Sequence, residues 1–274
     1  MILLATAAWA CGPDFPPYLL ALPPEAVQSP MIADFDAMIA NYLPSTRLPS
    51  AVAWGWEGVE QADAAAGLPA ALVQPWMAAR RAARAGDPFT VPEGLPEEYR
   101  LYLLGSAAYG KDRCADTSAF QALLALPPEQ RRNRTTWAEY TLATCAFPEE
   151  AIHRLEQVRA EALDGFADRW GLAASSYGEQ ARFYQRTPEA FRLYAAQAAS
   201  DPSGRTSLLV HAREALDAPE SLPRLAADPL ASTVISAYVL SRAAPDAVTA
   251  PSDTYLETFS SRHNADEDDA RRLR

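Results

Sequence analysis

The chain has few of the residues on which several protein classes depend. Only 3 of its 274 residues are cysteine and only 12 are glycine, which excludes disulfide-dense and collagen-like proteins. Lysine occurs once, at Lys111, and acidic residues outnumber Lys and Arg by 35 to 24, which gives a net charge of −11. With a pI near 4.8 the chain offers no basic surface for phosphates, so we expect no nucleic-acid partner.

Sequence motifs of known chemistry are also missing. The three histidines, His153, His211 and His263, are far apart, and none stands at the spacing of paired metal ligands. There is no glycine-rich phosphate loop and no G-x-S-x-G nucleophile elbow. The sequence therefore indicates no catalytic residue, no metal ligand and no cofactor, and an enzyme is the less favoured interpretation.

Alanine and proline are abundant, and both shape the expected fold. Alanine has the highest helix propensity, whereas the 23 prolines fall between apolar runs and stop helices. No stretch alternates apolar and polar residues as a half-buried strand would. These features predict an all-α fold in which an irregular, Pro-rich N-terminal part is followed by antiparallel helical hairpins.

Apolar periodicity, capping residues and prolines place the expected helices. Thr187 followed by Pro188 is typical of a helix start, for example. The predicted helices span 31–43, 69–85, 97–109, 115–126, 128–146, 148–172, 174–185, 188–200, 204–217 and 229–243. A Pro-rich linker at 87–96 suggests a division into an irregular region, 11–90, and a helical-repeat domain, 91–262, followed by a disordered charged tail, 263–274.

The N-terminus indicates export. Residues 2–10 are apolar but far too short to span a bilayer, and they end in Ala8-Trp9-Ala10, the A-x-A pattern that signal peptidase cuts. We therefore interpret residues 1–10 as an export signal remnant, with the mature chain starting at Cys11 in the periplasm, the cell envelope or the medium. The alternatives are an apolar helix of the fold, or lipidation of Cys11, which alone would attach the protein to a membrane.

A weak sequence pattern suggests a helical repeat. Gly178, then Ala190 and Tyr194, then Pro202 stand at the spacing of a helix pair that needs small residues at its crossing and a proline opening the next unit. Gly105 followed by Phe120 is a looser copy of the pattern. Over residues 97–217 the chain thus resembles tetratricopeptide-like (TPR or Sel1-like) repeat proteins.

This resemblance implies hairpins stacked as a short α-solenoid. Proteins of that kind usually bind other proteins along an extended face, so the resemblance also implies a scaffold or interaction role. A generic α-helical bundle is the alternative fold.

Two cysteines predict a disulfide bond. Cys114 and Cys145 flank the expected hairpin of helices 115–126 and 128–146, at nearly equal distances from its turn at Pro128. In an antiparallel hairpin they would meet at the open end, within the 7 Å between Cα atoms that a disulfide requires. Two separate buried thiols are the alternative.

Two functional hypotheses follow. The leading one is an exported helical-repeat protein that binds another protein or a cell-envelope component. The alternative is a secreted α-helical enzyme acting on glycans or peptidoglycan through paired carboxylates and aromatic platforms. Its candidate residues are Asp34 and Asp36, Glu57 and Glu60, and Trp54 with Trp56.

Overall fold

The computed structural model describes residues 31–48 and 56–240, and every regular element in these ranges is helical. No strand occurs within them, so the predicted all-α fold is confirmed. The α-helices are α2 (Met31–Ile39), α3 (Trp56–Gly67), α4 (Ala70–Ala85), α5 (Glu97–Lys111), α6 (Ser118–Leu124), α7 (Thr135–Ala143), α8 (Pro148–Leu163), α9 (Leu172–Ala181), α10 (Pro188–Ser200), α11 (Ser203–Leu216), α12 (Leu222–Ala226) and α13 (Pro229–Leu240). Single 3-10 turns are η2 (Ala40–Tyr42), η3 (Pro128–Gln130), η4 (Arg182–Tyr184) and η5 (Pro219–Ser221).

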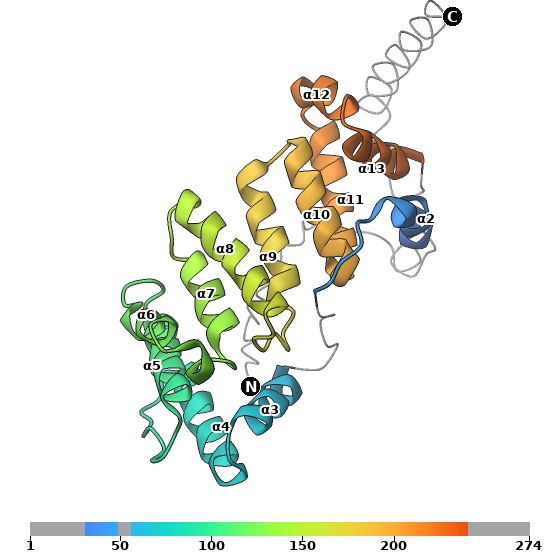
Figure 1. Ribbon diagram of the computed structural model, residues 1–274. Helices are drawn as coiled ribbons and strands as arrows, with labels where there is room; N and C mark the ends of the chain where they lie inside the picture. The colour runs from blue at the N-terminus through green and yellow to red at the C-terminus, as the bar shows by residue number, and fades with distance from the viewer. Residues whose placement is uncertain (1–30, 49–55, 241–274) are drawn as a thin grey trace, which may run out of the picture.

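Consecutive helices from α7 to α11 run antiparallel and pack as hairpins in one curved stack (Figure 1). Helix α7 contacts α9, and α9 contacts α11, so alternate helices form a continuous layer. The apolar core is divided into successive clusters along the stack instead of one central mass. This is the predicted short α-solenoid, in which each hairpin is stabilised by its neighbours.

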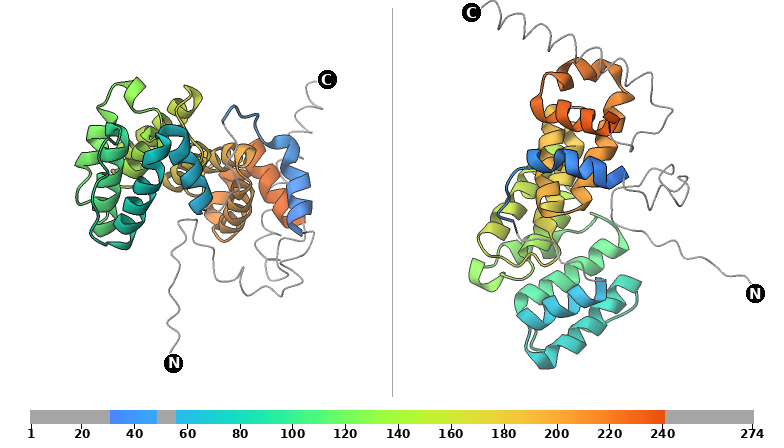
Figure 2. Two further views of the ribbon diagram at one scale, coloured as in Figure 1. Left: turned by 90° about the horizontal axis from the view of Figure 1, so that it is seen from below. Right: turned by 90° about the vertical axis from the view of Figure 1, so that its right-hand side faces the viewer.

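Helix α2, the first helix in the described residues, closes the far end of the stack. Phe35 and Ile39 of α2 are fully buried in the cluster formed by α10 to α13, so α2 lies against α13 (Figure 2). After α2 the chain returns toward the middle of the stack, where Leu48 packs with Val158 of α8 and Leu172 of α9. Residues near the start of the sequence thus cap the helices near its end.

Helix boundaries match the prediction where local capping decides them. Helix α10 spans Pro188–Ser200 as predicted, and the Thr187 side chain accepts the backbone N–H of Ala190. The prediction of one helix over 148–172 was too long, because α8 ends at Leu163. Gly165 there adopts a left-handed φ of 83°, a backbone conformation that favours glycine and ends the helix.

Helix α7 is shorter than predicted for a tertiary reason. It begins at Thr135 and not at 128. The carboxylate of Glu98, on α5, accepts the backbone N–H groups of Asn133 and Arg134. These donors precede the first turn of α7, and a side chain from another helix satisfies them, which fixes the helix start.

Helix α3 was not predicted, because its residues were assigned to the irregular region 11–90. Its buried face mixes apolar residues, Val59 and Ala64, with buried acids, Glu60 and Asp63, so apolar periodicity does not reveal it. Trp54 lies outside the described residues.

Helices α3 to α7 share one apolar cluster, so packing continues across the linker that was expected to divide the chain near residue 90. In the described ranges no helix combines the length and apolar character needed to cross a bilayer.

Candidate functional site

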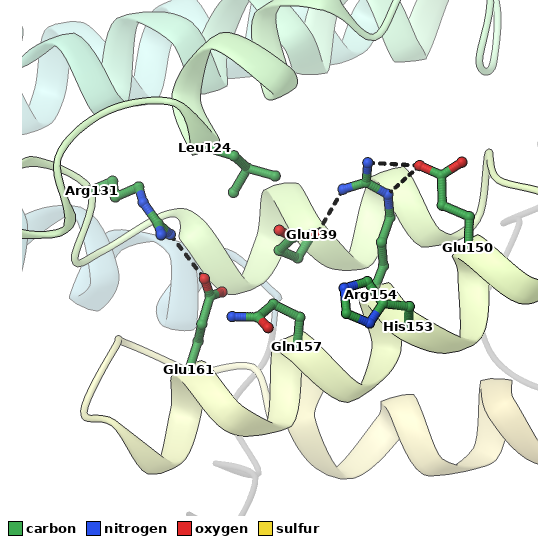
Figure 3. Close-up of a pocket in the computed structure, with 8 residues that line it drawn as sticks. All are labelled: Leu124, Arg131, Glu139, Glu150, His153, Arg154, Gln157 and Glu161. Carbon is green, nitrogen blue, oxygen red and sulfur yellow. Dashed lines mark hydrogen bonds and ion pairs between the residues drawn. The ribbon is translucent and has the colours of Figure 1, made fainter.

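A charged pocket lies on the exposed face of α8, with a cavity of about 290 Å³ (Figure 3). Helix α8 supplies most of the lining, because residues three and four positions apart share one face of a helix. The lining residues are Glu150, His153, Arg154, Gln157 and Glu161 of α8, Glu139 of α7, Leu124 of α6, and Arg131 from the turn between α6 and α7.

Two arginines link the acidic side chains of this pocket. Arg154 places Nη1 2.9 Å from Glu139 Oε2 and Nη2 2.7 Å from Glu150 Oε1. On the other side, Arg131 Nη1 lies 2.9 Å from Glu161 Oε1. Three carboxylates therefore face two guanidinium groups, and the pocket carries an excess of negative charge when all of them are ionised.

Burial controls the protonation of the two inner carboxylates. Glu161 is 3% exposed and Glu139 is 9% exposed. Burial raises the pKa of the Glu139 carboxyl and outweighs the opposing effect of Arg154. Burial likewise raises the pKa of Glu161, to which the nearby Glu139 charge contributes, against the effect of Arg131.

Glu161 also has unused hydrogen-bonding capacity. Its Oε2 atom is buried and has no hydrogen-bond partner. An unsatisfied buried acceptor is costly, so a donor placed beside it would be favourable. The pocket is therefore suited to a ligand that donates hydrogen bonds. Among the described residues no group of three His, Cys, Asp or Glu side chains is placed to hold a metal ion.

A buried ion pair fixes the turn that carries Arg131. Arg134, which is 1% exposed, places Nη1 2.5 Å from Asp63 Oδ2. Its guanidinium carbon lies 4.6, 4.7 and 5.0 Å from the ring centres of Trp76, Tyr99 and Tyr102. The cation–π contacts and the ion pair hold α3, α4, α5 and the start of α7 together. Arg131 is thereby held at the edge of the pocket.

The structure joins the cysteines for which the sequence predicts a disulfide. The Sγ atoms of Cys114 and Cys145 are 2.07 Å apart, and their Cα atoms are 5.2 Å apart. The bond connects the α5–α6 turn to the α7–α8 turn, at the open end of the α6–α7 hairpin. Cys11, the suggested mature N-terminus or lipidation site, lies outside the described residues.

The residues of the repeat pattern lie where two helices approach closely. A Cβ on Gly178 would lie 2.5 Å from Gln197 Oε1 of α10, so that glycine allows the α9–α10 contact. Ala190 is fully buried, Tyr194 packs beside it, and Pro202 stands immediately before α11. The looser pattern behaves similarly, because a Cβ on Gly105 would lie 2.8 Å from the Phe120 ring.

The two acidic residues of the enzyme hypothesis whose side chains are described, Asp36 and Glu60, do not converge. Asp36, on α2, pairs with Arg205 at 3.1 Å, whereas Glu60, on α3, pairs with Arg80 and Arg84. Helix α2 packs on α13 and α3 packs on α4, so the two acids lie in different parts of the stack. The side chains of Asp34, Glu57 and Trp56 are outside the described set.

Sequence reasoning missed the pocket itself. Glu150 was not singled out by the sequence, and His153 was noted only as a histidine without a paired metal-ligand spacing. The signal was present as a polar stripe along α8, in which Glu150, Arg154, Gln157 and Glu161 recur every three or four residues. The sequence could not show that Glu139 and Arg131 face this stripe.

No protein-family model, no curated protein and no solved structure matches the chain. Function therefore has to be argued from the geometry described above.

Proposed function

We propose that this protein is an exported helical-repeat scaffold that binds another protein or a cell-envelope component. The observation that carries this proposal is the stack of antiparallel hairpins, in which α7, α9 and α11 contact one another in sequence. A stack of this kind presents an extended surface in proportion to its length, and such surfaces commonly serve protein recognition.

The repeat pattern supports the same proposal. Gly178 and Ala190 pack at the α9–α10 contact, which is the packing that the resemblance to tetratricopeptide-like repeats requires. Membership of that family is part of the proposal.

The disulfide supports the export part of the proposal. Disulfides persist in oxidising compartments and are rare in the cytosol. Together with the A-x-A pattern before Cys11, the Cys114–Cys145 bond favours an extracytoplasmic location. Mass spectrometry of the protein recovered from fractionated cells tests this part: we expect an N-terminus at or near Cys11 outside the cytoplasm.

Exposed aromatic side chains mark one edge of the stack as the candidate contact surface. Phe147 is 86% exposed in the α7–α8 turn, and Phe183 is 42% exposed in the α9–α10 turn. Because successive helices are antiparallel, these two turns lie on the same edge (Figure 1). Aromatic residues are enriched at protein interfaces relative to the rest of the surface.

An affinity experiment tests the binding proposal. Immobilised protein would be incubated with cell-envelope extract, and captured partners would be compared between wild type and the F147S/F183S variant. Leu163→Ser is the matched control, since Leu163 is 56% exposed at the other end of α8. We expect one set of partners to be lost in F147S/F183S and retained in L163S; absence of any saturable partner would overturn the proposal.

One observation favours the glycan-enzyme alternative. Glu139 and Glu161 line one pocket and both have raised pKa values, as a general acid requires. Against it, each carboxylate is paired with an arginine, and no aromatic side chain lines the cavity as a sugar platform. Incubation with purified peptidoglycan and analysis of released fragments tests it; release that disappears in Glu139→Gln would establish this alternative.

A further inference from the structure

The guanidinium groups of the α8 pocket already donate hydrogen bonds to protein acceptors. Arg154 donates hydrogen bonds from Nε and Nη2 to Glu150 Oε1, and from Nη1 to Glu139 Oε2. Arg131 donates from Nε to the Leu126 carbonyl oxygen, and from Nη1 to both Thr135 Oγ1 and Glu161 Oε1. An anionic ligand would have to displace these carboxylates to reach either guanidinium group.

The acceptors, in contrast, are in excess. Glu161 Oε2 is buried without a partner, and three carboxylates oppose two guanidinium groups. Figure 3 shows the Gln157 amide nitrogen turned toward the Glu161 carboxylate. A cation that enters beside Glu161 meets a carboxylate acceptor and negative charge.

We propose that this pocket binds the cationic end of an arginine or lysine side chain from the partner protein. The inference deepens the proposed function and rests on it. A guanidinium or ammonium group would donate to Glu161 Oε2 and complement the excess charge. The Leu124 side chain supplies an apolar wall for the aliphatic part of the guest residue.

The size of the cavity agrees with a single side chain. Pockets for whole drug-sized ligands occupy roughly 300 to 1,000 Å³, and this one, at about 290 Å³, is just below that range. A single basic side chain is small enough to enter a cavity of this size.

Binding of a cation must be linked to the protonation of the carboxylates. The titratable and charged groups that face the cavity are Arg131, Glu139, Glu150, His153, Arg154 and Glu161. Because burial raises the pKa values of Glu139 and Glu161, a fall in pH neutralises them before exposed carboxylates. Affinity for a cation should therefore decrease as the pH falls through the raised pKa values of these two carboxyl groups.

The test uses the full chain and small probes of matched shape. N-acetyl-arginine amide and N-acetyl-lysine amide are titrated at pH 7 by NMR or calorimetry, and the citrulline analogue serves as the uncharged control. We expect saturable, millimolar binding of the two cationic probes and at least tenfold weaker binding of citrulline. Equal binding of citrulline, or no binding of either cation, would overturn the proposal without depending on any variant.

Variants locate the binding site. Glu161→Gln and Glu139→Gln should each weaken binding of the arginine probe by about tenfold or more, which corresponds to roughly 1.4 kcal/mol. Glu149→Gln is the matched control, since Glu149 is exposed on the same helix and does not line the pocket. Equal losses in E149Q would show nonspecific attraction to an acidic surface. The pH series is run in a His153→Gln background, so that the histidine does not contribute.

Comparing wild type with E161Q in both the partner-capture and the probe-binding experiments distinguishes a failure of this inference from a failure of the proposed function. If partners are captured equally by wild type and E161Q while the arginine probe does not bind, the pocket has no such role and the scaffold proposal stands. If the probe binds but no partner is captured, the scaffold proposal fails. A neutral sugar that binds more tightly than the cations would assign the pocket to glycans instead.

Discussion

Arg134 is enclosed by Trp76, Tyr99 and Tyr102, and its partner Asp63 is also bonded by Arg169 at 2.6 Å. At the scale of single residues, stability thus depends on charges that are buried together. A buried pair is weak evidence of stability, but removal of Arg134 empties a fully buried site and leaves Asp63 paired only with the partly exposed Arg169 among the ion pairs described.

Arg134→Ala is therefore expected to lower the free energy of unfolding by about 3 to 5 kcal/mol, measured by urea denaturation. Arg100→Ala is the control, because Arg100 and Glu97 form an exposed pair, and such pairs contribute about 0 to 1 kcal/mol. A cost below about 1 kcal/mol for Arg134→Ala would contradict this role.

Asp168 provides a test of pH dependence. Its carboxylate accepts the N–H groups of Leu172 and Ala173, 2.7 and 2.9 Å away, at the start of α9. Burial raises the pKa of Asp168 despite these bonds. The folded state therefore holds the proton more tightly than the unfolded chain, and this contribution to stability grows as the pH falls through the raised pKa.

Asp168→Asn should remove that dependence, because Asn does not titrate. Between pH 7 and pH 4, wild type should gain free energy of unfolding relative to D168N. At pH 7, Asp168→Ala should cost about 1 to 2 kcal/mol, since both donors lose their acceptor. Parallel pH profiles of wild type and D168N in urea denaturation would show that Asp168 does not titrate as described.

At the scale of elements, small residues set how closely helices pack. A Cβ on Gly204 would lie 2.2 Å from the backbone nitrogen of Ala198, so α10 and α11 meet backbone to backbone at this point. The backbone cannot move aside as a flexible side chain can. Gly204 is therefore required by packing, although its φ angle is ordinary.

Gly204→Ala is expected to destabilise the protein by about 1 to 3 kcal/mol through overpacking. Gly58→Ala is a control with the opposite expected sign. Gly58 lies in helix α3 and no atom lies within 4 Å of the position a Cβ would take, so the substitution should stabilise the protein by up to about 1 kcal/mol. Thermal denaturation of both variants measures the contrast. Equal effects of the two substitutions would refute the close approach.

The disulfide also acts at this scale, on one hairpin. Closing a loop of 31 residues should stabilise by about 3 to 4 kcal/mol through the entropy of the unfolded chain. The free energy of unfolding should fall by a similar amount on reduction, in Cys114→Ser, in Cys145→Ser and in the double variant, because each change breaks the same single bond. Additive losses in urea denaturation of the single and double variants would contradict this.

At the scale of the whole molecule, the stack should respond locally to damage. Phe35→Ala removes a fully buried side chain that packs α2 on α13, and such changes cost about 3 to 5 kcal/mol. In a linear array this loss is confined mainly to adjacent elements. Amide hydrogen exchange should accelerate in α11 and α13 while α5 to α7 keep their protection. Uniform acceleration would indicate one cooperative core.

The sequence by itself determined the helical character, most helix positions and the cysteine pairing. These features depend on local physics: alanine and proline set the elements, Thr187 and Pro188 set a helix start, and the turn near Pro128 brings Cys114 and Cys145 to one end of a hairpin. The resemblance to tetratricopeptide-like repeats likewise implied a close helix contact at Gly178 and Ala190.

Tertiary structure alone decided the rest, because it depends on residues distant in sequence. The start of α7 is fixed by Glu98, which is 35 residues before Asn133. The α8 pocket exists because Arg131 and Glu139 face α8, and α2 caps helices that follow it by almost 200 residues. Side chains such as Glu60 and Asp63 look solvent-facing in sequence; burial against arginines, which no local pattern encodes, makes them part of the core.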